Sequence, residues 1–414
     1  MNARAAPSAR QPLRSLDDAL ADLLARADVL AATDTVSTFG ADGRVLAQDL
    51  VSALQVPPQD NSSMDGYAVR SSEIADEGVP LPVSQRIPAG AAAEPLVPGS
   101  AARIFTGAPI PAGADAVVMQ EETEPAGEQI VRIMRVPDPG QWIRRSGEDV
   151  ARGAVVLSRG QRLSPAELGL AASIGMDKLV VASRPRVAMF STGDELVMPG
   201  EVAPALMKPG AIYNSNRFFL RAMLRRLGCD VTDMGIVPDR RDATVEALRT
   251  AAQEHDLILT SGGVSVGEED HIKPAVQQLG SLDLWQIAIK PGKPFAYGKV
   301  GAAHFIGLPG NPVSSFVTFV LLVRPFLLKL QGATELVPRR ASLPAHFEWP
   351  RADKRREFLR VRRNAHGGLD LFPNQSSGVL TSAVWGDGLV DNPPCQSIAR
   401  GDLVPFISLA DLLA

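Results

Sequence analysis

The stretch Leu257-Ile-Leu-Thr-Ser-Gly-Gly-Val-Ser-Val-Gly267 says most about the fold of this chain. It opens with an apolar run typical of a buried strand, and three glycines and two serines follow. Glycine adopts positive φ and lets the backbone approach a ligand closely, so consecutive N–H groups can converge on an anion while serine hydroxyls add donors. We predict a strand that runs into an anion-binding loop, although a glycine-rich turn that merely joins strand to helix would have the same composition.

Strand-like and helix-like segments alternate on both sides of this stretch. We expect strands at 187–191, 231–237 and 257–260, and helices at 216–227, 243–254 and 272–279. Such alternation predicts an α/β fold with a parallel, doubly wound sheet. Ligands of these sheets bind beyond the carboxyl ends of the strands.

Two more loops of this region have features of anion sites. Ile306-Gly-Leu-Pro-Gly-Asn-Pro-Val313 precedes an apolar helix whose first amides would face a ligand, with Pro312 suited to the first turn. Ile289-Lys-Pro-Gly-Lys-Pro-Phe295 places Lys290 and Lys293 beside a turn, where they could bind an oxyanion or simply be solvated. Three such loops at one sheet edge predict a phosphate-bearing ligand.

Acidic residues are expected at the same edge of the predicted sheet. Asp194 and Glu195 follow the first strand, Asp239 follows the second, and Asp270 lies just beyond the glycine-rich loop. Carboxylates in these places could hold Mg²⁺ against a phosphate. Helix N-capping is the competing interpretation for Asp239 and Asp270, because predicted helices begin soon after them.

The rest of the chain divides into regions of different texture. A helix with a capping-box-like start is expected from Ser15 to about Leu30, and another from Ser164 to Gly175. Short apolar runs separated by Pro and Gly indicate β-rich regions before and after the α/β part. We expect four domains: a discontinuous linker domain at 15–55 and 150–184, a β-rich inserted module at 56–149, the α/β domain at 185–332, and a C-terminal β-barrel or sandwich at 333–414.

The bulk composition excludes several classes of protein. The 414 residues include 42 Lys plus Arg and 46 Asp plus Glu, and a net charge of -4 argues against a general nucleic-acid binder. The longest apolar run, Phe316 to Val323, is too short for a membrane span and is expected in a buried helix. The distant Cys229 and Cys395 suggest neither a disulfide framework nor a zinc site, so a reducing cytoplasm fits best.

Seven motifs follow one another along the chain: Asn61-Ser-Ser-Met-Asp-Gly-Tyr-Ala68, Thr106-Gly-Ala-Pro109, Arg145-Ser-Gly-Glu-Asp149, Ser191-Thr-Gly-Asp-Glu-Leu196, Ser261-Gly-Gly-Val-Ser-Val-Gly267, Lys290-Pro-Gly-Lys-Pro294 and Leu308-Pro-Gly-Asn-Pro312. In this order they resemble the MoeA family of molybdopterin molybdenumtransferases, to which the gephyrin E domain and the plant Cnx E domain belong. The likeness covers nearly the whole chain.

The resemblance implies an enzyme that inserts molybdenum from molybdate into adenylylated molybdopterin, with Mg²⁺ and with release of AMP. It also implies an elongated homodimer, in which 15–55 and 150–184 serve dimerisation and 333–414 forms a β-barrel. The cleft would lie between the α/β domain of one subunit and the inserted module of its partner. Expected protein partners are the molybdopterin adenylyltransferase and the apo-molybdoenzymes.

The family's motifs also imply roles for individual residues. The catalytic set comprises Asp65, Thr106, Asp149, Glu195, Asp239 and Asp270, of which the last three would be metal ligands. The substrate-binding set comprises Ser261, Gly262, Gly263, Ser265, Gly267, Lys290, Lys293, Pro309, Gly310, Asn311, Pro312, Arg360 and Ser377. For Asp65 and Asp149 a purely structural role in a turn is the alternative.

Two other functions remain compatible with the sequence. A molybdopterin adenylyltransferase would share the α/β domain type and use ATP with Mg²⁺, although the additional β-rich regions favour the insertase. A gephyrin-like scaffold would bind partner proteins without catalysis. The sequence does not separate a preference for molybdate from one for tungstate.

Overall fold

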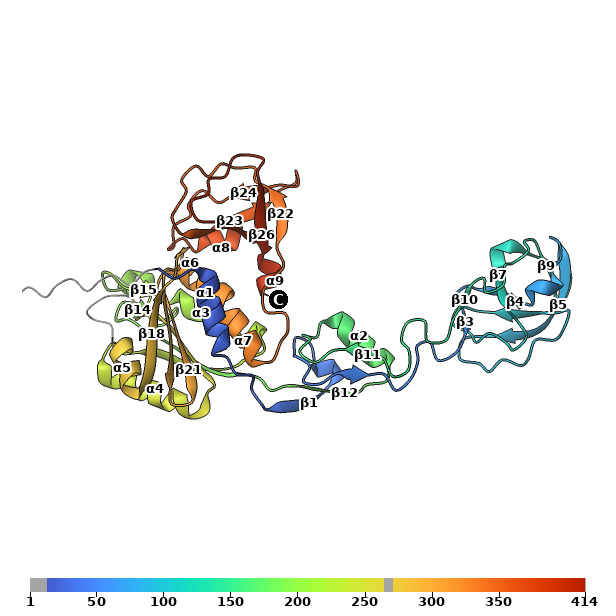
Figure 1. Cartoon of the computed structure of the whole chain (residues 1–414), viewed down its shortest axis with the longest axis horizontal. Coiled ribbons are helices and arrows are strands. Elements are labelled where there is room, and N and C mark those ends of the chain that lie inside the picture. The colour runs from blue at the N-terminus through green and yellow to red at the C-terminus, as the bar shows by residue number, and fades with distance from the viewer. Residues whose placement is uncertain (1–12, 264–270, 414) are drawn as a thin grey trace, which may run out of the picture.

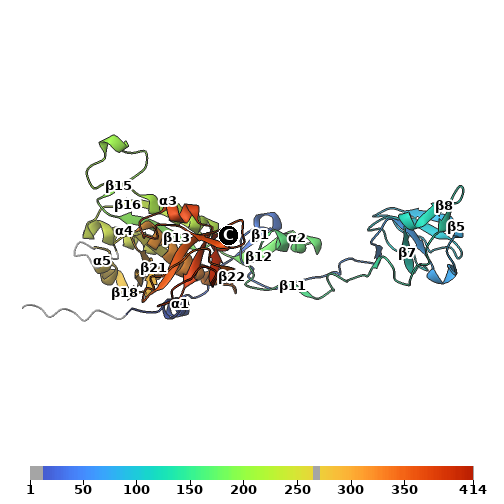
Figure 2. The ribbon, with the colours of Figure 1, turned by 90° about the horizontal axis from the view of Figure 1, so that it is seen from above.

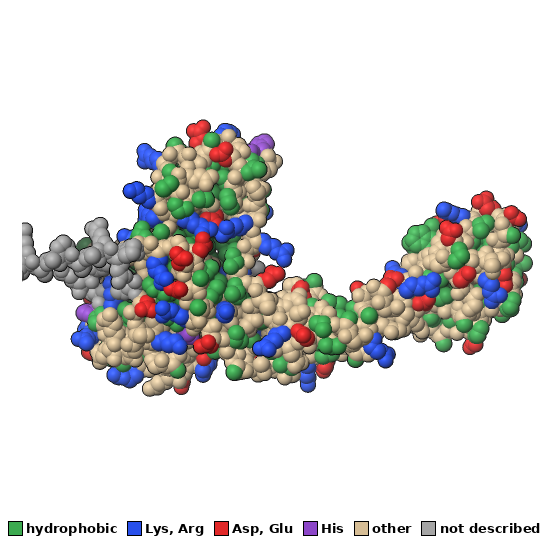
Figure 3. Space-filling model, in the orientation of Figure 1, with side chains coloured by type: hydrophobic (Ala, Val, Ile, Leu, Met, Phe, Trp, Pro, Cys, Tyr) green, Lys and Arg blue, Asp and Glu red, His purple; other side chains and the backbone are tan. Residues whose placement is uncertain are grey.

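The computed structural model describes residues 13–263 and 271–413 and shows an elongated chain of four regions (Figure 1). The α/β region and the C-terminal region form a large body at one end. A slender middle region leads from this body to a separate β-rich region at the other end, and the view from above shows the same extended shape (Figure 2). On the face drawn in Figure 3, basic and acidic side chains are interspersed.

A six-stranded sheet with the order β16-β13-β17-β21-β20-β18 is the centre of the α/β region. Its strands are β13 (Arg186–Thr192), β16 (Asp230–Val237), β17 (Leu257–Ser261), β18 (Gly280–Gln286), β20 (Pro294–Val300) and β21 (Ala303–Leu308). The first four strands of the order run parallel, as expected, whereas β20 runs antiparallel to both of its neighbours, β21 and β18. The expectation of a parallel sheet fails at β20 because only residues 301–302 join β20 to β21, and so short a connection makes a hairpin.

The helices pack on both faces of this sheet, as alternating side chains dictate. Val187 and Met189 of β13 point into one core, whereas Ala188 and Phe190 point into the other. The first core contains side chains from α1 (Leu16–Ala25), α3 (Ser215–Arg226), α6 (Pro312–Thr318), the π-helical η5 (Phe319–Val323) and α7 (Arg324–Leu330). The second contains side chains from α4 (Arg241–Glu254) and α5 (Ile272–Leu279). The expected strands and helices of this region are therefore confirmed within a few residues, although α1 ends before Leu30.

The helical run Pro312–Leu330 has the length and apolar character of a membrane span, with 19 residues and a mean hydropathy of 1.8. In this chain 89% of its most apolar window is buried inside the protein. Its side chains belong to the larger core of the α/β region. The run is thus the buried core helix that the sequence predicted around Phe316 to Val323.

The middle region is narrow, consists of two chain segments that run side by side, and has its own small core. Its elements are β1 (Thr33–Ser37), η1 (Thr38–Gly40), β2 (Leu50–Val51), β11 (Val155–Leu157), α2 (Pro165–Ser173) and β12 (Lys178–Ala182). Strand β1 pairs with β12, and β2 pairs with β11, both antiparallel. Helix α2 starts with the expected capping box, in which Ser164 and Glu167 satisfy each other's backbone.

The distal region is a small β structure, as its Pro- and Gly-rich texture predicted. A six-stranded sheet has the order β7-β4-β6-β5-β9-β8, and β3 pairs with β10 beside it. The elements are β3 (Asn61–Ser62), β4 (Gly66–Val69), η2 (Ser71–Glu73), β5 (Val79–Ile87), β6 (Ala101–Ile104), β7 (Ala116–Met119), η3 (Gln120–Glu122), β8 (Thr123–Pro125), β9 (Ile130–Ile133) and β10 (Ile143–Arg144). A bridge between Val56 and Val150 joins the two chain segments that enter and leave this region.

The C-terminal region is a sheet with the order β19-β23-β25-β26-β22, to which β24 adds on β23. Its elements are β19 (Ile289–Lys290), β22 (Ala341–Pro344), β23 (Arg356–Arg363), β24 (Leu369–Leu371), α8 (Thr381–Trp385), β25 (Gly388–Asn392), β26 (Leu403–Ser408) and α9 (Leu409–Leu413). An isolated bridge between Ala345 and Leu369 links the end of β22 to β24, and the closed barrel stays a prediction. The two short helices were not expected from the sequence.

The α/β and C-terminal regions are joined by a buried carboxylate. Strand β19 belongs to the α/β segment of the chain but pairs with β23, which sets Lys290 opposite Glu357. The carboxylate of Glu357 is 1% exposed and accepts hydrogen bonds from Lys290 Nζ at 3.0 Å and from Trp349 Nε1 at 2.7 Å. This junction fixes how the C-terminal region sits on the sheet.

We expect Glu357→Ala to lower the free energy of unfolding by about 3 kcal/mol, because it leaves the half-buried Trp349 indole N–H without its acceptor and removes the ion pair. Urea unfolding followed by tryptophan fluorescence measures the loss. The exposed Glu348 is nine residues away, and Glu348→Ala serves as the control with an unchanged midpoint. Equal midpoints for the two variants would contradict the role assigned to Glu357.

Candidate functional site

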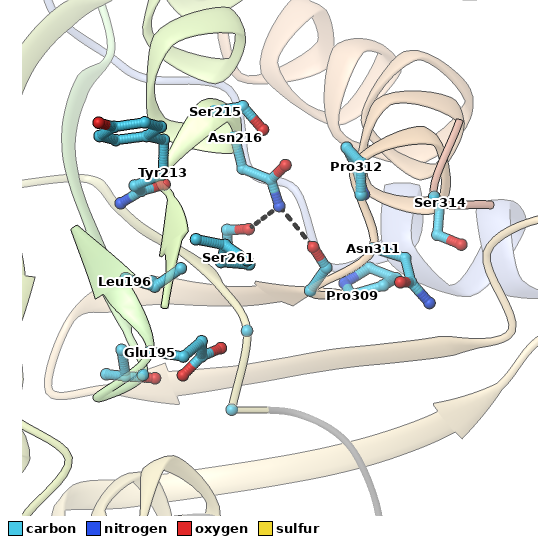
Figure 4. Close-up of a pocket in the computed structure, with 18 of the residues that line it drawn as sticks. Glu195, Leu196, Tyr213, Ser215, Asn216, Ser261, Pro309, Asn311, Pro312 and Ser314 are labelled. Carbon is cyan, nitrogen blue, oxygen red and sulfur yellow. Dashed lines mark hydrogen bonds between the residues drawn. The ribbon is translucent and has the colours of Figure 1, made fainter. Parts of the chain in front are cut away.

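A pocket of about 700 Å³ lies at the carboxyl edge of the parallel strands (Figure 4). The ends of β13, β17 and β21 and the start of α3 line it. The start of β20 reaches the same edge, through Pro294, because that strand runs antiparallel to β21. Nine of the expected site residues are brought together here: Glu195, Asp239, Ser261, Gly262, Gly263, Pro309, Gly310, Asn311 and Pro312.

The glycine-rich loop after β17 needs glycine for two reasons. Gly262 and Gly263 have φ values of +92° and +67°, a region that residues with side chains rarely adopt. A Cβ on Gly262 would also lie 3.1 Å from the carbonyl oxygen of Thr192, and one on Gly263 would lie 2.5 Å from Ile272 Cδ1. The loop therefore packs directly against the end of β13, with backbone exposed toward the pocket.

The loop after β21 lies beside the glycine-rich loop. The backbone N–H of Gly262 donates to the carbonyl oxygen of Leu308 at 3.0 Å, which ties the two loops together as they leave the sheet. Helix α6 then begins at Pro312 with Asn311 as its N-cap, as the sequence predicted. Two of the three expected loops thus form adjacent walls of one pocket.

The start of α3 forms a wall that the sequence did not suggest. Short strands β14 (Leu196–Val197) and β15 (Ile212–Tyr213) pair in parallel and lead into Asn214, which caps the helix. The side chain of Asn216 reaches from the first turn of α3 to both loops (Figure 4). The sequence Asn-Ser-Asn before a helix indicates a cap, but nothing local reveals the long-range contacts of Asn216.

Two carboxylates line the pocket, and neither caps a helix. Glu195 folds back over Gly193, where a Cβ would lie 2.5 Å from Glu195 Oε2. Asp239 precedes α4, but the N-cap of that helix is Arg240, so the capping interpretation of Asp239 was wrong. Among the described residues that line the pocket there is no Lys or Arg. The walls therefore combine negative side chains with backbone and amide groups.

The two lysines of the third loop do not line the pocket. Lys290 pairs with Glu357 and lies 3.4 Å from Asp353 Oδ2, so its charge is committed to the junction with the C-terminal region. Lys293 is exposed on the surface. The pairing of β19 with β23 directs Lys290 toward Glu357, and the binding of an oxyanion by the two lysines stays a prediction.

Arg360 and Ser377 act from behind the pocket wall. Arg360 is 1% exposed and donates to Ser382 Oγ at 3.1 Å and to the carbonyl of Phe358 at 3.0 Å; burial lowers the pKa of its guanidinium to about 10. Ser377 accepts a hydrogen bond on its carbonyl from the Val313 amide at 2.9 Å. The next residue, Gly378, lines the pocket, so the C-terminal region completes its rim.

The three expected catalytic residues outside the α/β region lie far from this pocket in the chain. Asp65 and Thr106 belong to the distal region at the opposite end of the molecule, and the exposed Asp149 is in the connection to it (Figure 1). Asp65 Oδ1 accepts from the Thr106 backbone N–H at 2.7 Å and from its hydroxyl at 2.8 Å, which lowers the pKa of the Asp65 carboxyl. The amide of Asp149 donates to Val56, as a turn residue does.

Three other expected site residues, Ser265, Gly267 and Asp270, lie outside the described residues. Within 13–263 and 271–413 no group of three or more His, Cys, Asp or Glu side chains is arranged to hold a metal ion. Any cation site built from the described residues would therefore have at most two such side chains.

Comparison with known proteins agrees with this architecture. Models of the MoeA N-terminal region (domain I and II), a probable molybdopterin binding domain and the MoeA C-terminal region (domain IV) match residues 14–175, 188–329 and 342–409. The molybdopterin molybdenumtransferase of Haemophilus influenzae is 42% identical over 334 residues, or 80% of each chain. Molybdopterin molybdenumtransferase 2 of Mycobacterium tuberculosis is 39% identical over 376 residues, covering 87% of this chain and 90% of the relative.

A solved structure shows the same arrangement of the chain. The molybdopterin biosynthesis moeA protein from Pyrococcus horikoshii superposes with a TM-score of 0.83 at 29% identity. The superposition covers 96% of this chain and 100% of the Pyrococcus horikoshii chain.

We expect Gly263→Ala to abolish the thermal stabilisation that inorganic pyrophosphate gives to the wild-type protein, because a Cβ there collides with Ile272 and alters the loop. The control is Gly301→Ala in the β20–β21 hairpin, where φ is also positive at +59° but no atom lies within 4 Å of the added Cβ. That variant should lose only about 1 kcal/mol of stability from backbone strain and still respond to pyrophosphate. Equal responses from both variants would rule out the loop as the phosphate site.

Proposed function

The chain belongs to the MoeA family, and on this premise we propose that it is a molybdenum insertase, which transfers molybdenum from molybdate to adenylylated molybdopterin and releases AMP. Relatives named molybdopterin molybdenumtransferase match most of the chain, including the regions on both sides of the α/β part. The observation that carries the proposal is the pocket at the carboxyl edge of β13, β17 and β21. It lies within the part that matches a probable molybdopterin binding domain.

The pocket is suited to a ligand with a pyrophosphate group. The exposed backbone of Gly262 and Gly263 offers donors without side chains in the way, and such donors suit phosphate oxygens. The α3 helix directs the positive end of its dipole at the same space. In a pocket without described basic side chains, these dipoles orient the substrate while leaving its pyrophosphate bond open to attack.

Magnesium fits the donors of the pocket. Mg²⁺ prefers carboxylate oxygens and is commonly held by one or two carboxylates together with substrate phosphates and water. Glu195 and Asp239 provide two carboxylates on the pocket wall, and an anionic substrate beside them would be repelled without a cation. Glu195 and Asp239 would hold the ion, which when bound supplies positive charge against the pyrophosphate.

A homodimer would bring the separated motif residues into one site. Asp65 and Thr106 lie at the far end of an extended chain, and the middle region holds that end away from the pocket (Figure 1). The middle region also exposes apolar surface: Phe39 in η1 is 101% exposed, and Val51 and Val155 are more than half exposed. Apolar groups of this kind mark protein contact surfaces. In the proposed dimer, the distal region of one subunit covers the pocket of its partner.

The proposed reaction also implies partners and a cellular location. Adenylylated molybdopterin must come from a molybdopterin adenylyltransferase, and the finished cofactor must pass to apo-molybdoenzymes. We place these exchanges in the cytoplasm, where unpaired thiols such as those of Cys229 and Cys395 persist.

We expect Glu195→Gln and Asp239→Asn each to lower molybdate-dependent AMP release by at least about tenfold, because each removes a proposed ligand of the cation. Purified protein is incubated with adenylylated molybdopterin, Mg²⁺ and molybdate, and both AMP and activation of a cofactor-free molybdoenzyme are measured. Asp242→Asn, three residues from Asp239 on the exposed face of α4, is the control and should keep full activity. Synthesis of adenylylated molybdopterin from ATP would favour the adenylyltransferase, and binding without turnover would favour the scaffold.

Complementation between two inactive variants tests the shared site. Co-expressed Asp65→Ala and Asp239→Asn subunits with different tags should form mixed dimers in which one of the two sites is intact. A random mixture should then recover about a quarter of the wild-type activity. Co-expressed Glu195→Gln and Asp239→Asn subunits should recover none, because both changes lie in the same region. Recovery in neither mixture, with both dimers formed, would mean that each subunit works alone.

A further inference from the structure

Asn216 is the residue that links the walls of the pocket. Its side chain is 7% exposed, and Nδ2 donates to Ser261 Oγ at 2.8 Å and to the carbonyl oxygen of Gly310 at 2.8 Å (Figure 4). Ser261 ends β17, and Gly310 lies in the loop after β21. We propose that Asn216 is a positioning residue for the insertion reaction, which sets the spacing of the two loops that hold the phosphate part of the substrate. This inference rests on the proposed function.

The chemistry of the amide fixes its role as indirect. A carbonyl oxygen only accepts hydrogen bonds, so the group facing Gly310 must be the NH₂ and not the oxygen of Asn216. That NH₂ has two protons, and the two loops use both of them. No donor of the side-chain amide is left for phosphate oxygens, which only accept hydrogen bonds, and Asn216 therefore acts on the phosphate part of the ligand through Ser261 and Gly310.

The helix that carries Asn216 is itself held in place. Asn214 Oδ1 accepts a hydrogen bond from the backbone N–H of Arg217 at 3.3 Å, and the backbone N–H of Asn214 donates to the carbonyl of Val197 in β14 at 2.9 Å. Arg217 Nε lies 2.8 Å from Asp233 in β16, at the edge of the sheet. The first turn of α3 is thus fixed to β14 and β16, and Asn216 transmits that fixed position to the loops after β17 and β21.

The two loops also approach each other directly. The backbone N–H of Gly262 donates to the Leu308 carbonyl where the strands end, and a Cβ built on Gly310 would lie 4.0 Å from Gly262 Cα. Glycine-rich backbone has many accessible conformations. A donor that bridges the two loops removes that freedom before the substrate arrives, which improves binding by preorganisation.

The test compares Asn216→Leu with Thr244→Val. Leucine keeps the approximate volume of Asn216 and removes its donors. Thr244 is also buried in the α/β region, and its Oγ1 donates to the Arg240 carbonyl at 2.9 Å. It lies in α4 and does not line the pocket. Each variant thus loses buried hydrogen bonding of similar kind. Calorimetric titration with AMP and the kcat and KM of molybdate-dependent AMP release are measured for the wild type and both variants.

Asn216→Leu should weaken AMP binding and raise the KM for adenylylated molybdopterin by at least about tenfold, the size of one lost net hydrogen bond. Thr244→Val should lower the melting temperature by a similar amount and leave the Kd and KM unchanged. If both variants lose stability alike and both bind AMP as the wild type does, Asn216 is a structural residue and the inference is wrong. If the wild type itself neither binds AMP nor releases it, the proposed function fails first.

Discussion

The parallel pairing of β17 between β13 and β21 is the constraint on which the site depends. All five residues of β17 are buried, and they pair in register with Val187–Ser191 on one side and with His304–Leu308 on the other. Because side chains alternate between two cores, a shift of one residue would move Leu257 and Leu259 from one core into the other. Burial on both faces therefore fixes the register, and the register brings the three strand ends level.

The level strand ends explain why the pocket is lined by backbone and amides. Glycines at 262 and 263 lie against Thr192, so the polypeptide itself forms the wall nearest the sheet. The basic residues that the family motifs suggested for an anion are used elsewhere. Lys290 joins β19 to Glu357, and Arg360 supports the loop ahead of Gly378 from within the C-terminal region. Among the described residues, the pocket lining therefore offers an anionic ligand backbone and amide groups and no Lys or Arg.

Local sequence was enough for much of the fold and for part of the site. The strand-loop pattern of 257–263 and the Pro-Gly-Asn-Pro turn at 309–312 are set by nearby residues, and both lie where they were predicted. The ion pair of Lys290 with Glu357 was not predicted, because Glu357 is 67 residues away and the pairing of β19 with β23 is not visible locally. Asn216 was missed for the same reason, since its bond to Gly310 spans 94 residues. The antiparallel direction of β20 was missed because the hairpin at 301–302 was not recognised.

The extended middle region holds Asp65 and Thr106 away from the pocket. Its own packing explains why the two sites stay apart within one chain. Two antiparallel chain segments cross it, paired through β1 with β12 and through β2 with β11, and a core of its own fills the space between them. Folding back would break these ladders and expose that core. In the proposed dimer, a second copy would reach the pocket without breaking these ladders, and it would bury Phe39 and its apolar neighbours. The hydrogen bonds that Thr106 donates to Asp65 lower the pKa of that carboxyl and fix it in the distal region, where the proposed dimer would use it.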